Sequence, residues 1–239
     1  MRALPFLLCA VVLTATAADR VGGSVGITSD YRLEGLSLSA NTAAVQAEVH
    51  YQQPTEDRGA WYIGLWASQV RLGNQTSSSG QIGPFLGLQW AMGTDWLGSA
   101  VISHYAHPWN ALLKRYDYDE LTVGMSFRDR LKFTAAYSPD TDLYSHYGFI
   151  ENRRSLAYEV AGTIPVRGAL AASAGVGFRD VSDFFESSGG YWYGSAGLSY
   201  DRGHLHASLL RIQTDHTAQR LFYSDLVDPA WVGTLLWAF

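Results

Sequence analysis

The stretch ELTVGMSF, residues 120–127, alternates polar and apolar side chains one by one. One face carries Leu121, Val123, Met125 and Phe127, and the other carries Glu120, Thr122, Gly124 and Ser126. Because successive side chains of a strand point to opposite faces, this period of two predicts a β-strand with one apolar and one polar face. A tilted strand that crosses a membrane needs about nine to eleven residues, close to this length.

The same alternation recurs along the chain, most clearly in residues 43–51, 131–138 and 156–164. It predicts strands near 22–31, 42–52, 60–71, 81–92, 96–106, 117–127, 131–138, 155–164, 169–179, 191–200, 204–212 and 230–239. Alternating strands also explain why the mean hydropathy is near zero, since apolar and polar faces cancel. We therefore expect an all-β fold, a transmembrane antiparallel up-and-down β-barrel of about twelve strands.

The predicted connections between strands fall into two groups. Long, polar connections are expected at 139–154, 180–190 and 213–229, with one of intermediate length at 107–116. Short ones are expected at 53–59, 93–95, 128–130, 165–168 and 201–203. Bacterial barrels have short periplasmic turns and longer extracellular loops, so both termini are expected in the periplasm.

The N-terminal residues have the pattern of a cleaved signal peptide. A positive Arg2 precedes a mostly apolar run and the small residues of an Ala-x-Ala site, so we expect residues 1–17 to be removed, with cleavage after Ala17 or Ala18. Residues 18–239 are then the outer-membrane β-barrel domain. Cys9 is the only cysteine, so the mature chain is expected to lack disulfides, cysteine–zinc sites and thiol nucleophiles.

Charge and aromatic residues add to this interpretation. The formal net charge of −5 argues against nucleic-acid binding, which requires a basic surface. The 8 Trp, 14 Tyr and 10 Phe residues are expected to form two girdles at the membrane interfaces. One set flanks the short turns: Tyr51, Trp61, Trp90, Trp96, Phe127 and Tyr200. The other lies toward the long loops: Tyr31, Tyr105, Tyr118, Tyr137, Phe178, Trp192 and Trp231.

The last strand, residues 230–239, places Trp231, Leu235, Trp237 and Phe239 on one face. An apolar face that ends in a terminal aromatic residue is similar to the signal that the barrel-assembly machinery reads. We expect Trp237 and Phe239 to form this barrel-closing signal.

Residues 29–39, Ser-Asp-Tyr-Arg-Leu-Glu-Gly-Leu-Ser-Leu-Ser, resemble the N-terminal signature of the TorF-like porins of proteobacteria. Shorter echoes follow at residues 64–68 and 136–140. The resemblance implies an outer-membrane channel of undefined substrate. Glu34 departs from the signature, because the family commonly has a second arginine there; a selectivity inferred from the family therefore does not carry over directly.

The polar faces of the strands predict which side chains line the lumen. They are Asp30, Arg32, Glu34, Glu48, His50, Glu120, Lys132, Glu159, Arg179, His204 and His206. Charges of both signs can polarise permeating solutes and tune ion selectivity. Alternatively they form a salt-bridged plug, since narrow barrels fill their interior with side chains. The sequence leaves both alternatives open.

One pair suggests an enzyme. His206 and Ser208 share a strand face, so the histidine can act as a base toward the serine, as in outer-membrane lipid hydrolases. The asparagine and glycine expected nearby are replaced by Leu209 and Leu210, so we expect no catalysis. No metal, cofactor or nucleotide motif is found in the sequence.

The leading prediction is a porin-like channel in the outer membrane of a Gram-negative bacterium, for passive diffusion of small solutes or ions. A lipid hydrolase and a plugged structural or surface-binding barrel are the alternatives. The expected partners are outer-membrane lipids, lipopolysaccharide, the assembly machinery and the permeating solutes.

Overall fold

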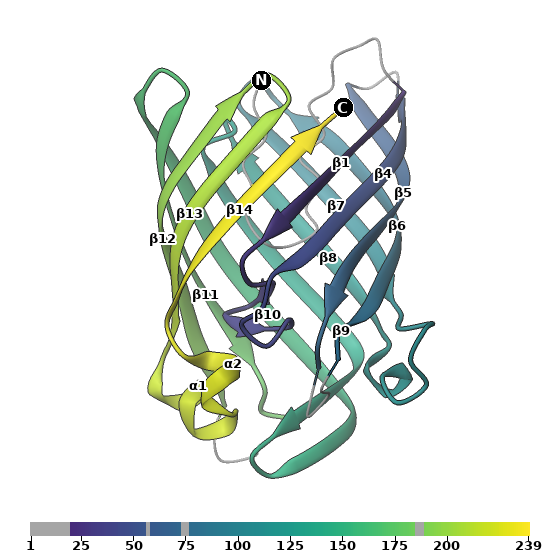
Figure 1. Ribbon diagram of the computed structural model, residues 1–239. Coiled ribbons are helices and arrows are strands. Elements are labelled where there is room, and N and C mark those ends of the chain that lie inside the picture. Colours follow the sequence, from purple (N-terminus) through teal and green to yellow (C-terminus); the bar gives the residue numbers. More distant parts are fainter. Residues whose placement is uncertain (1–19, 56–57, 73–76, 185–188) are drawn as a thin grey trace.

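The computed structural model describes residues 20–55, 58–72, 77–184 and 189–239; the predicted signal peptide with Cys9 lies outside these residues. Twelve strands form one closed antiparallel barrel, which confirms the predicted fold (Figure 1). They are β1 (Val21–Thr28), β4 (Ala44–Pro54), β5 (Gly59–Val70), β6 (Ser79–Met92), β7 (Trp96–Tyr105), β8 (Tyr118–Phe127), β9 (Leu131–Ser145), β10 (Gly148–Arg167), β11 (Leu170–Asp180), β12 (Gly190–Arg202), β13 (Leu205–Thr214) and β14 (Ala230–Ala238). Two short strands, β2 (Arg32–Leu33) and β3 (Leu36–Ser37), pair separately.

The barrel has its apolar face outside. On β8, Leu121, Val123 and Met125 are 44–46% exposed, whereas the inward-facing Glu120 and Thr122 are 7% and 8% exposed. A soluble protein would bury the first set, so this exterior fits contact with lipid hydrocarbon. Closure of the sheet gives every membrane-spanning strand two hydrogen-bonded neighbours, which lipid requires because it offers no partner to the backbone.

The barrel closes where β1 pairs with β14, in the register Ser24–Ala238 to Thr28–Thr234. At the end of this seam the backbone amide of Gly23 donates to the carbonyl of Phe239 over 3.0 Å, and the amide of Phe239 donates back over 2.9 Å. A Cβ added to Gly23 would lie only 2.9 Å from the Phe239 ring, so the terminal ring lies over this glycine. Phe239 therefore contributes both backbone pairing and ring packing to closure.

Short and long connections lie at opposite ends of the barrel, and the C-terminus lies at the end with the short turns (Figure 1). The turn between β8 and β9 holds Arg128 and Asp129 at φ 50° and 54°, the positive values that tight hairpin turns require. The predicted short connections at 93–95 and 128–130 agree with the observed strand ends.

The long connections contain more regular structure than the sequence predicted. The predicted loop 139–154 is mostly strand, because β9 and β10 stay paired out to Ser145 and Gly148. Polar and apolar residues do not alternate in this segment. A hairpin that extends into water has no face in contact with lipid, so alternation is not required there. The loop 213–229 contains the helices α1 (His216–Leu221) and α2 (Ser224–Val227), and Asp215 caps α1 by accepting from the Ala218 amide. Among the described residues, no helix is long and apolar enough to cross a membrane.

Two other predictions are corrected. β1 ends at Thr28 rather than at residue 31, and the chain then turns into the barrel. Tyr31, Tyr105 and Tyr118 were expected in the outer girdle. Tyr31 and Tyr105 are instead only 6% and 4% exposed, and the ring of Tyr118 stacks on that of Tyr105 with centroids 4.5 Å apart. Tyr105 and Tyr118 point inward because they share a strand face with the buried Ser103 and Glu120, and Tyr31 is buried because it lies in the segment that turns into the barrel after Thr28. Trp192 and Trp231, 55% and 60% exposed, do lie on the outside.

Replacing Phe239 with serine should slow assembly and lower the folded fraction, because the closing seam loses the ring that covers Gly23. Phe239→Tyr, which keeps the ring, should assemble as the wild type does. The measurement is heat-modifiable migration on gels after refolding into lipid vesicles. Equal folded fractions for the serine variant and the wild type would contradict a closing role for the ring.

Candidate functional site in the barrel lumen

Residues 29–43, here called the inner hairpin, leave β1 and fold into the lumen before β4 begins (Figure 1). The tip residues Glu34 and Gly35 have φ values of 51° and 83°. A Cβ on Gly35 would lie 2.6 Å from Cγ2 of Thr214 and 2.8 Å from Cβ of Tyr193, on the walls formed by β13 and β12. Glycine is therefore required at the tip by both the backbone conformation and the close approach.

The hairpin is held together by a buried charge pair. Asp30 is 4% exposed and Arg32 is 1% exposed, and Nε of Arg32 lies 2.5 Å from Oδ2 of Asp30. The other carboxylate oxygen of Asp30 accepts from the hydroxyls of Ser37 at 2.6 Å and Ser39 at 2.9 Å. The serines and the aspartate that carry the TorF-like resemblance are thus the bonded residues of one small folded unit.

The Arg32 guanidinium reaches beyond this pair. It donates to the carbonyl of Gly35 at 3.2 Å, to the carbonyl of Asp228 at 2.9 Å and to Oδ1 of Asn41 at 2.8 Å. A buried guanidinium is stable only when its donors find acceptors, and these contacts provide them. The prediction of Arg32 as an open pore charge on a barrel strand is corrected: the guanidinium is buried, paired with Asp30 and bonded to the hairpin and to the Asp228 carbonyl.

Glu34 connects the hairpin tip to the barrel wall. Its Oε2 lies 2.8 Å from Nη1 of Arg179 on β11, and both side chains are below 10% exposed. Nε of Arg179 also donates to Oγ of Ser155 at 3.0 Å, and the hydroxyl of Tyr191 donates to the Glu34 carbonyl at 3.2 Å. We call the Glu34–Arg179 pair the latch. In barrel order β11 is separated from β1 by β14, β13 and β12, so the latch fixes the hairpin across the lumen.

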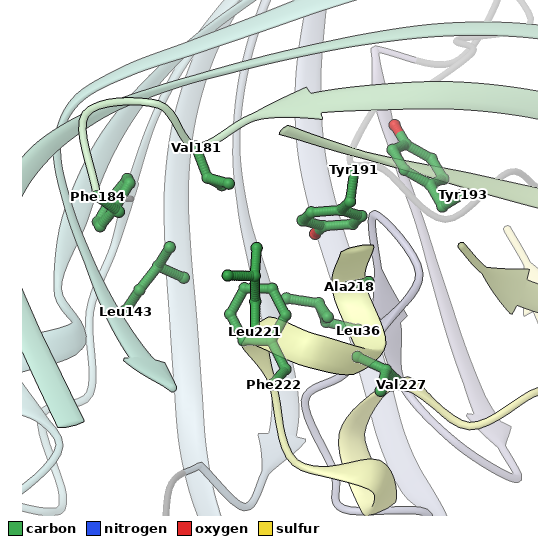
Figure 2. Packing of buried hydrophobic residues seen from close by; sticks show 10 residues of the cluster. All are labelled: Leu36, Leu143, Val181, Phe184, Tyr191, Tyr193, Ala218, Leu221, Phe222 and Val227. Carbon is green, nitrogen blue, oxygen red and sulfur yellow. The ribbon is translucent and has the colours of Figure 1, made fainter. Parts of the chain in front are cut away.

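The outer side of the hairpin is covered by α1 and α2 (Figure 2). Leu36 of the hairpin packs in one buried cluster with Tyr191 of β12 and with Leu221 and Phe222 of the helical loop. The side-chain amide of Asn41 also donates to the Asp225 carbonyl in α2. The hairpin is therefore enclosed between the wall and the helical loop.

The remaining predicted lumen residues lie on the inner wall. Nδ1 of His50 is 2.6 Å from Oε1 of Glu48 on β4, and Nδ1 of His206 is 2.5 Å from Oδ1 of Asp201. Lys132 on β9 and Glu159 on β10 are diagonal neighbours, since their register partners are Ala161 and Thr134. Both side chains are half-buried on the polar face.

His204 is the exception among these predictions. It lies in the turn before β13, is exposed, and stacks on the outward-facing Trp237 with ring centroids 5.4 Å apart. Its Nδ1 lies 2.7 Å from the Ala238 carbonyl. The predicted position in the lumen is wrong, because the strand pattern was extended by one residue into a turn.

A cavity of about 110 Å³ lies between the inner hairpin and the inner faces of β8, β9 and β10. Leu33, Leu36, Leu38, Tyr116, Tyr118, Leu143 and Phe222 supply its apolar lining, and Glu34, Gln81, Glu120, Thr141, Asp142 and Arg179 its polar lining. Near the outer opening, burial raises the pKa of Asp142 above its usual value, and burial raises that of Tyr116 to about 12. Of the polar lining residues, Glu34, Glu120 and Arg179 were predicted to line the lumen. Gln81 was not, although the alternation of buried and exposed residues from 81 to 89 on β6 gives its inward position.

The enzymatic alternative gains no geometric support. Nε2 of His206 is buried without a hydrogen-bond partner among the described residues, so it is not bonded to Ser208. Within those residues no group of three or more His, Cys, Asp or Glu is arranged to hold a metal ion. The absence of catalysis stays a prediction, which a phospholipid or lipid A hydrolysis assay with Ser208→Ala would test.

The latch should be essential for the fixed position of the hairpin. Glu34→Gln leaves the Arg179 charge buried without its counter-ion, at a cost of about 3–5 kcal/mol. We expect faster hydrogen exchange of the hairpin amides, residues 31–38, with little change in the barrel strands. Replacing both partners together, by Glu34→Leu with Arg179→Met, should recover much of the protection, because no unpaired charge remains.

Asp95→Asn is the matched control. Oδ1 of Asp95 lies 2.9 Å from Nε of Arg128, but this pair is on the surface, where the side chains of Asp95 and Arg128 are 38% and 61% exposed. Exposed pairs contribute about 0–1 kcal/mol, so exchange in the hairpin should not change. Unaltered exchange in Glu34→Gln would show that the latch does not hold the hairpin.

Comparisons with known proteins agree on the fold. Among 74 matching chains is a structure described as "Unveiling the Mechanism Behind the in-meso Crystallization of Membrane Proteins", with a TM-score of 0.56 and 8% identity over 91% of this chain and 83% of that one. LpxR from Salmonella typhimurium has a TM-score of 0.48 and 9% identity over 91% and 99% of the two chains. The Pseudomonas putida toluene transporter TodX has a TM-score of 0.45 and 9% identity over 93% and 89%. At 8% identity the first of these likenesses extends to the fold alone.

A comparison with curated protein sequences finds no match. The resemblance to the TorF-like porins is not confirmed under that name. The sequence profile of a family described as "Bacterial protein of unknown function (Gcw_chp)" matches residues 13–239, almost the whole chain. The chain therefore belongs to the Gcw_chp family of bacterial proteins.

Proposed function

We propose that this protein is a passive channel for small solutes or ions in the outer membrane of a Gram-negative bacterium. The observation that carries the proposal is the division of the lumen into two parts. Near the short turns the inner wall mixes small residues with larger polar ones such as Gln52, Gln89 and His206, and nearer the long connections the inner hairpin narrows the lumen. A lumen lined by small and polar side chains, in series with a fixed constriction, suits selective diffusion.

The small residues come from five strands around the wall. They are Ser24, Ser99, Gly124, Ser195 and Ser208, on β1, β7, β8, β12 and β13. All five are half-buried, whereas larger inward residues of the same region, Gln52, Tyr62 and Gln89, are buried. Small barrels of about eight strands fill with side chains, and those of sixteen or more hold water. Small residues on the inner wall leave more of the lumen unfilled by side chains, so they favour a water-filled interior in a barrel of twelve strands.

The lumen carries more acidic than basic groups. The latch pair and the Asp30–Arg32 pair each cancel internally. Outside these two pairs, Lys132 is the one Lys or Arg among the predicted lumen residues, against Glu48, Glu120 and Glu159. Rings of acidic side chains favour cations in a pore, so we expect a cation-preferring channel.

The expected surroundings follow from the same proposal. The exposed apolar band contacts outer-membrane lipids and lipopolysaccharide, and the terminal strand is read by the barrel-assembly machinery. The resemblance of residues 29–39 to the TorF-like signature supports a channel, and Glu34 now has a role of its own in the latch. A plugged structural or surface-binding barrel is the remaining non-enzymatic alternative.

Single-channel recording of the refolded protein in planar bilayers tests the proposal. In a salt gradient the reversal potential should show cation preference, Glu159→Lys should shift it toward anions, and Lys132→Glu should strengthen the cation preference. The shifts should shrink with salt, because the Debye length falls from about 30 Å at 0.01 M to about 3 Å at 1 M.

Asp119→Asn is the control, because Asp119 is exposed on the outer end of β8, beside His104, and does not face the lumen. Absence of conductance in the wild type would favour the plugged barrel. If the protein conducts but neither Glu159→Lys nor Lys132→Glu changes the reversal potential, the proposed basis of selectivity is wrong.

A further inference from the structure

We propose that the cavity between the inner hairpin and strands β8 to β10 binds a small organic cation, an ammonium group attached to a compact apolar body. The inference rests on the proposed function only in treating this ligand as a permeating solute; binding itself does not require conduction. Three features of the cavity lead to this class of ligand: its apolar wall, its excess of acid, and its unpaired buried polar atoms.

The apolar wall selects a hydrocarbon body. Leu33, Leu36 and Leu38 of the hairpin face the cavity together with Leu143, Phe222 and the rings of Tyr116 and Tyr118. An engineered cavity of about 150 Å³ holds benzene, so a volume of about 110 Å³ that opens outward suits a ring or chain of similar size. Aromatic faces also attract ammonium groups.

The acid excess selects a positive charge. Glu34, Glu120 and Asp142 line the cavity, and Arg179 is the only Lys or Arg of the lining among the residues that the structure describes. Arg179 is already engaged by Glu34 at 2.8 Å and by Ser155 at 3.0 Å. Glu120 is 7% exposed and forms no ion pair among the described residues; its Oε1 accepts one hydrogen bond from Thr122 at 3.0 Å. Burial with one neutral donor favours the protonated form of a carboxyl group, so the charged form is stabilised when a cation binds beside it.

The unpaired atoms select a multiple hydrogen-bond donor. Oε1 of Gln81 and Oγ1 of Thr141 are buried without a partner among the described residues, and both line the cavity. The two residues are 2% and 6% exposed, so water at the surface does not serve them. Buried polar atoms normally have partners, and an ammonium group brings three donors to a site rich in acceptors.

Other ligand classes fit less well. An anion would face three carboxylates and find the only guanidinium already paired. A neutral alcohol would fill the apolar wall but leave the Glu120 charge without a counter-charge. The geometry therefore matches the apolar ammonium class on all three features.

Benzylamine is the probe, with benzyl alcohol and benzoate as neutral and anionic analogues of the same shape. Binding is measured by calorimetric titration of the refolded protein in detergent micelles, and the difference between variants removes partition into the micelle. Benzylamine should bind saturably. Benzyl alcohol and benzoate should bind at least about tenfold more weakly, because they lack the charge-assisted hydrogen bond of the ammonium group.

Glu120→Gln keeps the shape of the side chain and removes its charge. It should lower the affinity for benzylamine about tenfold and leave the affinity for benzyl alcohol unchanged. Gln81→Leu should lower the affinity for benzylamine several-fold, because the bound ammonium group loses one hydrogen bond. Asp119→Asn, adjacent in sequence but outward-facing and 56% exposed, is the matched control and should bind as the wild type does.

Equal affinities for benzylamine and benzyl alcohol, or wild-type affinity in Glu120→Gln, would overturn the site. Conductance is recorded on the same preparations. A protein that conducts but does not bind benzylamine overturns this inference and leaves the channel proposal standing. A protein that binds benzylamine in a Glu120-dependent way but does not conduct supports the site and contradicts the channel.

Discussion

The structure depends on one constraint: a backbone that crosses lipid must satisfy its hydrogen bonds within the protein. A sheet meets this condition only when its two edges join, which here happens along the seam between β1 and β14. Phe239 pairs with Gly23 on both backbone groups and covers it with its ring, so this residue extends the closing seam. The alternation of side chains follows from closure, because a closed sheet has one face toward lipid and one toward the lumen.

Closure also creates a problem for the interior. Twelve strands enclose more space than side chains on the wall readily fill, and several residues of the inner wall near the short turns are small. Nearer the long connections the chain itself occupies the space, as the inner hairpin. Its charges are neutralised in pairs, Asp30 with Arg32 within the hairpin and Glu34 with Arg179 across the lumen. These pairs specify one position for a segment that would otherwise have several.

The fold was largely predictable from the sequence because the period of two is a local property. On β8 the exposed Leu121 and the buried Glu120 follow directly from the alternation. Paired strands beyond the membrane were missed, because Asp140 and Asp142 lie where lipid no longer imposes alternation. The local pattern likewise cannot show that the chain leaves the wall at Thr28, since the polar–apolar alternation continues through Arg32 and Glu34. The partner of Glu34 lies on β11, and no feature of residues 29–43 points to it. Gly35 and the serines at 37 and 39 were the available signals of a turn.

The central claim is that the latched hairpin sets the open cross-section of the lumen. The most direct measurement is the single-channel conductance of a variant in which residues 33–37 are replaced by two glycines. Its control is a variant with a deletion of equal length in the exposed outer hairpin, within residues 147–153. The account predicts a larger conductance step for the first variant and a step of wild-type size for the second. An unchanged or smaller step in the first variant, with the barrel folded, would contradict it.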